Sequence, residues 1–422
     1  MTGGKGLGIL LQNLLSATIN SPKPFFGLVY AELPMLLAGV SKYWLSSWFA
    51  VSGFGFALSE MLKCRRIISL LQRVFSLMVY NELRKDYLLN RWVVIATERS
   101  RRPIEFTKQK AESVQTIVCP LCVGNEHMTP PAVLLYLKQN GEIKKDKDHN
   151  GQRPKNWLVR VIPNLYPAFV PPKEQADQLQ IMKSENFGHA VGHHEVLVES
   201  PNHDEDPADA ELPQLKHLIH AYIDRFRELA AKPYVRYVSI FRNYGREAGA
   251  SLSHAHSQII AMPAVPRIVK EEQIAGKNFY DQHQKCVFCD IIEKETKSPR
   301  LILVNSNFVV FAPYASVNPL EFWILPKKHD VNIINLTNPE IKAFAEILKT
   351  SLKALKNLVN DPPYNYGFHL ALNHKAENYY HWHLEVYPKL AVWAGFEKNT
   401  GMHINTVTPE TAAAELRKTI SA

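Results

Sequence analysis

A histidine-containing stretch at residues 249–260 has the residue types and spacing best suited to covalent chemistry. It reads Gly-Ala-Ser-Leu-Ser-His-Ala-His-Ser-Gln-Ile-Ile. Because side chains alternate along a strand, His254, His256 and Gln258 should share one face. The small residues before them would let backbone N–H groups and a hydroxyl approach a phosphate closely. A polar edge strand, or a pair of metal ligands without catalysis, would also fit this stretch alone.

The same order of features occurs twice in the chain. A Cys-x-x-Cys pair, a strand that ends near a histidine, a helix, a second strand and a His-x-His motif follow one another in both copies. The spacing of apolar residues predicts the two helices over residues 209–231 and 339–359. This period is too long for a solenoid, so we expect an internal duplication of one α+β domain.

The duplication predicts two similar metal sites. Thiolate and imidazole ligands with no open position are typical of structural zinc, which is therefore the expected cofactor. A redox dithiol or buried free cysteines are the alternatives, but a redox pair would not explain the histidines. Zinc-bound cysteines favour a reducing, cytoplasmic location. The predicted ligands are Cys119, Cys122, His203 and His254 in the first site, and Cys286, Cys289, His329 and His381 in the second.

If His254 binds metal, His256 stays free on the same face. A neutral imidazole is a good nucleophile near pH 7, and it could attack the phosphorus of a diphosphate and carry the nucleotidyl group. The Gln258 amide could hold a phosphoryl oxygen. The second copy has His383 in the matching place but Glu385 where Gln258 would be, and a carboxylate would repel phosphate. We therefore expect one copy to be catalytic.

The body of the chain alternates predicted strands and helices. Apolar segments predict strands at 92–96, 159–162, 195–199, 237–241, 322–325 and 366–372. The polar, glycine-containing residues 139–157 predict a loop, and residues 264–285 a charged helical connector. The arginines at 99, 101 and 102 could clamp phosphate, although a solvated basic turn is an equal alternative.

Length and charge limit the other possibilities. The chain has 422 residues and a formal net charge of +9, of which residues 1–77 carry +5. The remaining +4 does not indicate a nucleic-acid partner. The uncharged run at 43–59 is slightly short for a bilayer span, so a membrane segment is not favoured. We expect an N-terminal extension at 1–77, which could be a misassigned start, then a catalytic domain at 78–272 and a second domain at 273–422.

The segment from Phe241 to Gln258 resembles the active-site signature of the galactose-1-phosphate uridylyltransferase family, in the histidine-triad superfamily. Supporting motifs lie at 99–103, 119–122, 163–167, 200–203 and 395–397. The resemblance covers about residues 82–420. It implies two fused histidine-triad domains, each an antiparallel half-barrel sheet with helices, in a homodimer whose partner helps complete the site.

The resemblance also implies a ping-pong reaction. UDP-glucose would transfer its uridylyl group to His256, and a hexose 1-phosphate such as galactose 1-phosphate would then accept it. Glu397 would contact the sugar. The residues implied to hold the nucleotide and its phosphates are Arg99, Arg102, Asn164, Asn243, Gly249, Ser251 and Gln258.

Two departures leave alternatives open. Ala255 stands where many members have proline, which the chemistry does not require. The second Cys-x-x-Cys pair and residues 394–401 also resemble the ADP-glucose phosphorylases, which adenylylate the same histidine and pass the group to phosphate. Uridylyl transfer is the leading hypothesis and adenylyl transfer the alternative. A zinc-stabilised nucleotide-binding protein without turnover is the hypothesis from a different class.

Overall fold

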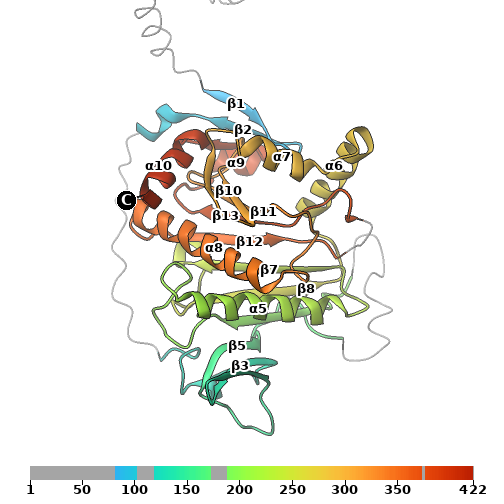
Figure 1. Cartoon of the computed structure of the whole chain (residues 1–422), viewed down its shortest axis with the longest axis vertical. Helices are drawn as coiled ribbons and strands as arrows, with labels where there is room; N and C mark the ends of the chain where they lie inside the picture. The colour runs from blue at the N-terminus through green and yellow to red at the C-terminus, as the bar shows by residue number, and fades with distance from the viewer. Residues whose placement is uncertain (1–80, 102–117, 173–187, 373–375, 422) are drawn as a thin grey trace, which may run out of the picture. The chain divides into compact units, whose positions relative to one another are not determined.

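A computed structural model describes residues 81–101, 118–172, 188–372 and 376–421, and Figure 1 shows their arrangement. The predicted extension at 1–77 and Arg102 lie outside these residues. Within the described ranges, no helix is both long enough and apolar enough to cross a membrane. The helices are α5 (Leu212–Ala230), α6 (Arg267–His283), α7 (Val287–Glu295), α8 (Asn338–Val359), α9 (Gly395–Thr400) and α10 (Pro409–Ser421), with short 3-10 turns η1 (Thr97–Arg101), η2 (Glu126–Met128) and η3 (Arg246–Ala248).

Most strands join one antiparallel sheet of eleven strands, in the order β4-β3-β5-β6-β8-β7-β12-β13-β11-β10-β9. The first half of the sheet meets the second where β7 pairs with β12, and the two are continuous there. Its strands are β3 (Leu134–Gln139), β4 (Glu142–Asp146), β5 (Trp157–Pro163), β6 (His193–Val198), β7 (Tyr237–Tyr244), β8 (His256–Met262), β9 (Leu301–Val304), β10 (Phe308–Phe311), β11 (Phe322–Pro326), β12 (Tyr364–His369) and β13 (His383–Pro388).

Both halves of the sheet have the same strand order when counted outward from their junction. The first runs β7-β8-β6-β5-β3, and the second runs β12-β13-β11-β10-β9. In each half the long helix, α5 or α8, connects the third of these strands to the first. The α+β class is confirmed. The repeated order agrees with an internal duplication, which stays a prediction.

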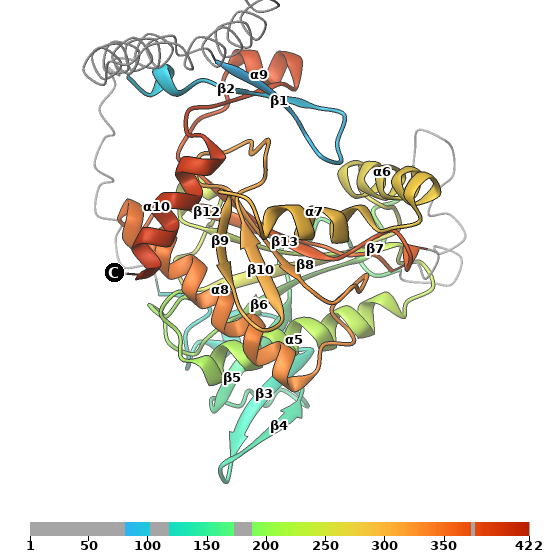
Figure 2. The ribbon, with the colours of Figure 1, turned by 45° about the horizontal axis from the view of Figure 1, so that its top comes forward.

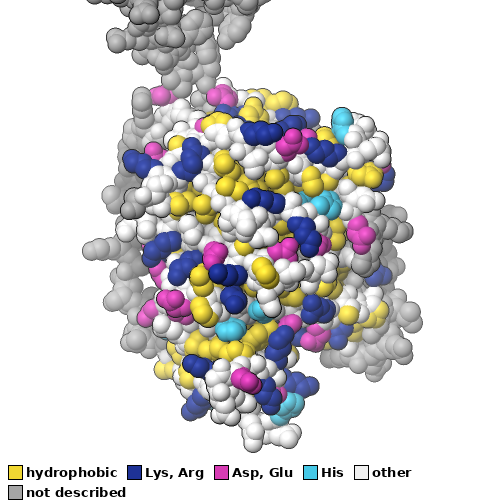
Figure 3. Space-filling model, in the orientation of Figure 1, with side chains coloured by type: hydrophobic (Ala, Val, Ile, Leu, Met, Phe, Trp, Pro, Cys, Tyr) yellow, Lys and Arg dark blue, Asp and Glu magenta, His cyan; other side chains and the backbone are white. Residues whose placement is uncertain are grey.

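Helices α5 and α8 lie side by side against one face of this sheet (Figure 1). Their apolar stripes form the main core with the strands beneath them. The predicted helices at 209–231 and 339–359 are confirmed to within three residues. Thr337 caps α8, since its side chain accepts from the Glu340 N–H. On the outward side, the described Lys and Arg side chains are interspersed with Asp and Glu (Figure 3).

The opposite face of the second half is covered by α6 and α7, which contact each other and belong to a second core. Strand β10 shows why both faces are apolar. Phe308 and Val310 belong to the core beneath α8, whereas Val309 and Phe311 belong to the core with α7. Since successive side chains point to opposite faces, a strand covered on both sides becomes a continuous apolar run.

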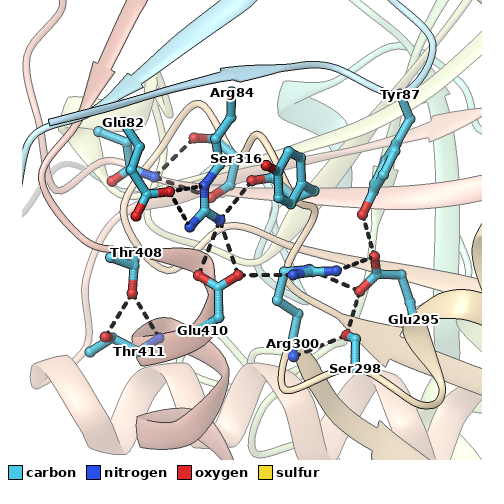
Figure 4. Close-up of polar contacts among 12 residues, drawn as sticks. Glu82, Arg84, Tyr87, Glu295, Ser298, Arg300, Ser316, Thr408, Glu410 and Thr411 are labelled. Atoms are coloured by element: carbon cyan, nitrogen blue, oxygen red, sulfur yellow. Dashed lines mark hydrogen bonds and ion pairs between the residues drawn. The ribbon is translucent and has the colours of Figure 1, made fainter. Parts of the chain in front are cut away.

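A second, smaller sheet contains β1 (Glu82–Lys85), β2 (Trp92–Ile95) and β14 (His403–Asn405). Figure 2 shows α9 beside it, and Figure 4 shows the ion pairs that tie its first strand to α10. Arg84 and Arg300 lie 3.0 and 2.9 Å from the same Glu410 oxygen, and Arg300 also pairs with the buried Glu295 at 2.8 Å. These contacts tie β1 to α10, and β1 pairs with β2, the strand that precedes Arg99.

The predicted loop at 139–157 is wrong in its first part. Residues Glu142–Asp146 form β4, which pairs with β3 as a hairpin. Asn140 and Gly141 make the turn, with φ values of 49° and 85°. Asn-Gly is the preferred sequence for this two-residue turn, because both positions need a positive φ. The sequence pattern did not indicate this strand because most of its side chains are charged and exposed, as is common in strands at the edge of a sheet.

Candidate active site and metal centres

The turn before β8 places small residues beside the predicted nucleophile. Strand β8 begins at His256, so the predicted strand from residue 249 is too long at its start. Gly245 and Gly249 have φ values of 80° and 90°, a region that glycine enters without steric cost. The N–H groups of Ala248 and Ala250 both donate to the Gly245 carbonyl. This compact turn leaves Gly249 and Ser251 exposed.

The His256 side chain has its proton on a defined nitrogen. Its Nδ1 lies 2.8 Å from the His254 carbonyl oxygen, and a carbonyl can only accept, so Nδ1 donates. The lone pair is therefore on Nε2. His256 is 7 % exposed, so its imidazole is largely enclosed. This is the arrangement that a histidine nucleophile requires.

Gln258 is oriented by His194, a residue that the sequence motifs did not identify. The Ala168 N–H donates to His194 Nδ1 at 3.1 Å, so the proton is on Nε2. That nitrogen donates to the Gln258 Oε1 at 2.8 Å. The Asn164 NH₂ group lies 3.1 Å from the same nitrogen, but both are then donors, so this contact is not a hydrogen bond. The Gln258 NH₂ group is therefore left for another acceptor. No sequence motif identified His194, because it reaches Gln258 only through the pairing of β6 with β8, in which Val196 lies opposite Gln258.

A buried polar network, also missed from the sequence, supports β8 from the other face. Ser257 donates to Glu199, and the Tyr222 hydroxyl contacts both Ser257 and Tyr366. Arg242 donates to Glu199 at 3.0 Å. Burial alone would lower the pKa of Arg242, but Glu199 outweighs this effect and raises it. The charges of this pair are therefore retained inside the core, directly behind the strand that carries His256.

The four predicted ligands of the first metal site come together. Their ligand atoms all lie within 4.8 Å of one another. His203 Nδ1 is 3.2 Å from the Cys122 sulfur, and His254 Nδ1 is 3.5 Å from it and 3.8 Å from the Cys119 sulfur. Zinc–ligand bonds of about 2.0–2.3 Å separate tetrahedral S and N ligands by roughly 3.6 Å. The donor set and spacing fit a closed, four-coordinate metal site.

Contacts of the other ring nitrogen, Nε2, orient the two imidazoles of this group. His254 Nε2 donates to the Ser200 carbonyl at 2.8 Å, and His203 Nε2 lies 3.0 Å from the Ser253 hydroxyl. These bonds direct both Nδ1 atoms at the thiols. Burial lowers the pKa of His254, which favours the neutral form that binds metal.

The second predicted group has the same arrangement. The ligand atoms of Cys286, Cys289, His329 and His381 again lie within 4.8 Å of one another. The Cys289 sulfur is 3.3 and 3.6 Å from the two Nδ1 atoms. The Nε2 of His381 donates to the Pro326 carbonyl at 2.8 Å, and that of His329 lies 2.5 Å from the Glu377 carbonyl. This site also fits a tetrahedral metal.

A third group of two histidines and two glutamates lies in the second half, and its ligand atoms are also within 4.8 Å of one another. Its members are Glu272, His369, His383 and Glu385. His369 Nδ1 is 2.8 Å from Glu272, and His383 Nε2 is 3.2 Å from Glu385. Each imidazole therefore already has a carboxylate partner. The sequence motifs identified His383 and Glu385 but not the other two residues.

Comparisons with known proteins match the part of the chain that carries both halves of the sheet. Residues 75–266 match the family described as galactose-1-phosphate uridyl transferase, N-terminal domain, and residues 184–422 match a domain of unknown function, DUF4921. The chain is 34% identical to ADP-glucose phosphorylase from Arabidopsis thaliana, over 80% of this chain and 92% of that protein. The chain belongs to the galactose-1-phosphate uridylyltransferase family. A galactose-1-phosphate uridylyltransferase from Thermotoga maritima is 28% identical over 80% of this chain and 98% of that protein.

Solved structures of the galactose-1-phosphate uridylyltransferase family share the fold. The crystal structure of the Arabidopsis ADP-glucose phosphorylase with bound ADP-glucose has a TM-score of 0.68 and 32% identity, and covers 80% of this chain and 99% of its own. A structure of uridylyltransferase has a TM-score of 0.60 and 28% identity, with 81% and 99% covered. The chain is therefore a member of a family of nucleotidyltransferases.

Two residues that the family resemblance implied are not joined to the rest by any described contact. Arg99 is exposed on η1, and the Glu397 carboxylate accepts from the Ala394 N–H at the start of α9. Both belong to the small-sheet segment, whereas His256 lies on the large sheet. The structure thus brings together Asn164, His194 and Gln258, and leaves Arg99 and Glu397 apart from them.

Proposed function

We propose that this chain transfers a nucleotidyl group through a covalent intermediate on His256. The observation that supports this most strongly is the bond from His256 Nδ1 to the His254 carbonyl, which leaves the Nε2 lone pair for attack. In the first step, Nε2 forms a bond to the α-phosphorus of a sugar nucleotide. The bond from that phosphorus to the bridging oxygen breaks, and the sugar 1-phosphate leaves with the electron pair. In the second step, a phosphate oxygen of the acceptor displaces the imidazole.

Three groups of this chain suit the charge that develops during these steps. The Gln258 NH₂ group, held by the His194 contact to its oxygen, would donate to a phosphoryl oxygen. The exposed turn at Gly249 and Ser251 would supply further donors. Asn164 and Asn243 would hold the nucleotide. These roles rest on the family resemblance together with the positions described above.

ADP-glucose is the donor that we propose, with inorganic phosphate as acceptor. Two points favour it. The chain is 34% identical to an ADP-glucose phosphorylase, and its second Cys-x-x-Cys pair is part of the sequence resemblance to that group. The products would be glucose 1-phosphate and ADP. The second candidate is the uridylyl transfer expected from the sequence, from UDP-glucose to galactose 1-phosphate, and the matched N-terminal family and the Thermotoga relative support it.

We also propose that both Cys/His groups hold structural zinc. Each offers four soft or borderline ligands at tetrahedral spacing. Bound zinc would fix the 119–122 and 286–289 segments against the sheet, and the first site would fix His254, whose carbonyl orients the nucleophile. The four cysteines are free thiols, which agrees with a cytoplasmic location.

A homodimer would give Arg99 and Glu397 a role. We propose that they reach the active site of a second copy of this chain. Apolar side chains are exposed just before Glu397, with Val392 91 % exposed and Trp393 and Phe396 more than 40 %. Exposed apolar groups in one segment are typical of an interface. We propose domain boundaries at 1–77, 78–272 and 273–422, with the two large domains as a duplicated histidine-triad unit.

Intact-protein mass spectrometry tests the proposal. The chain is incubated with ADP-glucose or UDP-glucose without acceptor, and the mass of the protein is recorded. An AMP-sized adduct supports the ADP-glucose donor, and a UMP-sized adduct supports the second candidate. The His256→Ala variant should form neither and keep its zinc. If zinc-loaded protein forms no adduct with either donor, the covalent mechanism is refuted and a binding protein without turnover is favoured.

A further inference from the structure

The junction of the two halves places a residue of the second half directly against the candidate active site. In the register of β7 and β12, Asn365 lies opposite Asn243. Tyr364 and Tyr366 point into the core beneath α5 and α8, so Asn365 points to the other face, the face of His256 and Gln258. None of the sequence motifs identified Asn365, because its partner is more than a hundred residues away.

The contacts of Asn365 determine which way both amides point. Its Nδ2 lies 2.7 Å from the Ala248 carbonyl oxygen and 2.8 Å from Asn243 Oδ1. A backbone carbonyl only accepts, so the Asn365 atom that faces it must be the NH₂ group. Its second hydrogen then goes to Asn243, whose facing atom must be the oxygen. The Asn243 NH₂ group is therefore turned to the other side.

The Asn243 NH₂ group faces the exposed glycine turn. Its nitrogen lies 3.8 Å from the position that a Cβ would take on Gly249. The Ala248 carbonyl, held by Asn365, is one residue before that glycine. One amide thus fixes both the donor of Asn243 and the backbone of the turn at which the phosphates would bind.

We infer that Asn365 is a positioning residue for nucleotide binding, and that it makes the active site of the first half depend on the second half. It acts through Asn243, by keeping that NH₂ group directed at the nucleotide. This inference rests on the proposed function, because it assumes that a nucleotide binds beside His256.

Two substitutions separate orientation from simple loss of a contact. In Asn365→Ala the Asn243 amide is free to rotate, and we expect about tenfold weaker binding of ADP-glucose, in line with the loss of part of one oriented donor. In Asn365→Asp the carboxylate accepts only, so Asn243 would turn its NH₂ group toward position 365 and present its oxygen to the phosphate. We expect about 100-fold weaker binding for this variant, since a repulsive contact replaces an attractive one.

A matched control variant distinguishes an effect on folding from an effect on the position of Asn243. Asn305 also donates its amide to a backbone carbonyl, that of Ala343 at 2.7 Å, but it lies between β9 and β10 at the far edge of the second half. Asn305→Ala should lower the melting temperature at least as much as Asn365→Ala and leave the dissociation constant of ADP-glucose within about twofold of the parent value.

The decisive experiment is a double-mutant cycle with Asn243→Ala, measured by calorimetry in a His256→Ala background so that no turnover occurs. If Asn365 acts through Asn243, adding Asn365→Ala to Asn243→Ala should weaken ADP-glucose or UDP-glucose binding by no more than about twofold. Fully additive losses, or unchanged binding by Asn365→Asp, overturn the inference. The mass-spectrometric adduct assay on the parent chain tests the proposed function separately. If the parent chain binds neither sugar nucleotide, the inference about Asn365 and the proposed function are both refuted.

Discussion

Replacing Gln258 with glutamate tests the phosphate contact with almost no change in shape. The Gln258 oxygen accepts from His194 at 2.8 Å, and a glutamate oxygen can accept the same bond. The substitution therefore changes only the other end of the group, where an NH₂ donor becomes a charged oxygen. The chain already contains this difference, because the second half has Glu385 at the corresponding position of β13.

The expected effect has two parts. Loss of one preorganised donor to a phosphoryl oxygen costs about 10²–10³ in rate. Two negative charges about 4 Å apart repel by about 4 kcal/mol at an effective dielectric constant of about 20, which alone is close to 10³. Because the two parts are not independent, we expect Gln258→Glu to slow adduct formation by at least about 10³. Gln258→Met adds no charge, but it loses both the donor and the oxygen that accepts from His194, so it should be slowed by about 10².

The assay is the time course of adduct formation on His256 after mixing with excess sugar nucleotide, followed by intact mass. Zinc content and melting temperature are recorded for each variant to show that the fold is kept. If Gln258→Glu forms the adduct within about tenfold of the parent rate, the Gln258 amide does not contact the phosphate that reacts. A methionine variant as slow as the glutamate variant would refute the electrostatic part alone.

Three further predictions follow from the buried groups. His254→Ala should lose one of two bound zinc ions by metal analysis and lower the unfolding midpoint, whereas His256→Ala should keep both ions. Arg242→Met should lower the free energy of unfolding by about 3–5 kcal/mol in urea titrations at pH 7, because Glu199 is left charged and unpaired in the core; a double variant with Glu199→Gln should recover part of this loss. Burial alone would lower the pKa of His369, but its two buried carboxylate neighbours outweigh this and raise it to about 9. Protonated His369 should therefore stabilise the fold, fully so below pH 6.5. The free energy of unfolding should fall by on the order of 3 kcal/mol as the pH rises from 6.5 to 9, and this pH dependence should be absent in His369→Gln.

Local patterns predicted most of the secondary structure that carries the site. The helices α5 and α8 have a clear 3.6-residue period, and the duplicated order of cysteines and histidines was enough to identify both metal groups. These signals are local, or they repeat within the chain. They do not depend on how the two halves of the sheet meet.

Residues whose roles come from pairing across the sheet were missed. His194 becomes relevant only because β6 pairs with β8, and Asn365 only because β12 pairs with β7. Neither belongs to a motif, and an ordinary polar residue in a strand has no sequence signal that identifies its partner. The Glu199–Arg242 pair was missed for the same reason, since each residue alone is a charged group next to a predicted strand.

The structure also gives a physical reason why only one half would be catalytic. His383, the counterpart of His256, donates from Nδ1 to the His381 carbonyl, and its Nε2 lies 3.2 Å from Glu385. Burial raises the pKa of Glu385, but the imidazoles of His369 and His383 outweigh this effect and lower it to about 2, so the carboxylate is ionised and can only accept. The Nε2 of His383, which corresponds to the nitrogen proposed to attack in His256, is therefore occupied by its contact with the Glu385 carboxylate.

The packing around His383 also blocks access of a substrate to its ring. The His383 side chain is fully buried, and the Phe288 and Trp323 rings lie 5.0 and 5.3 Å from its ring. His256 is 7 % exposed and has an amide instead of a carboxylate two residues later. A carboxylate in place of the Gln258 amide therefore occupies the imidazole nitrogen that would otherwise be available, while the strand order around it stays the same.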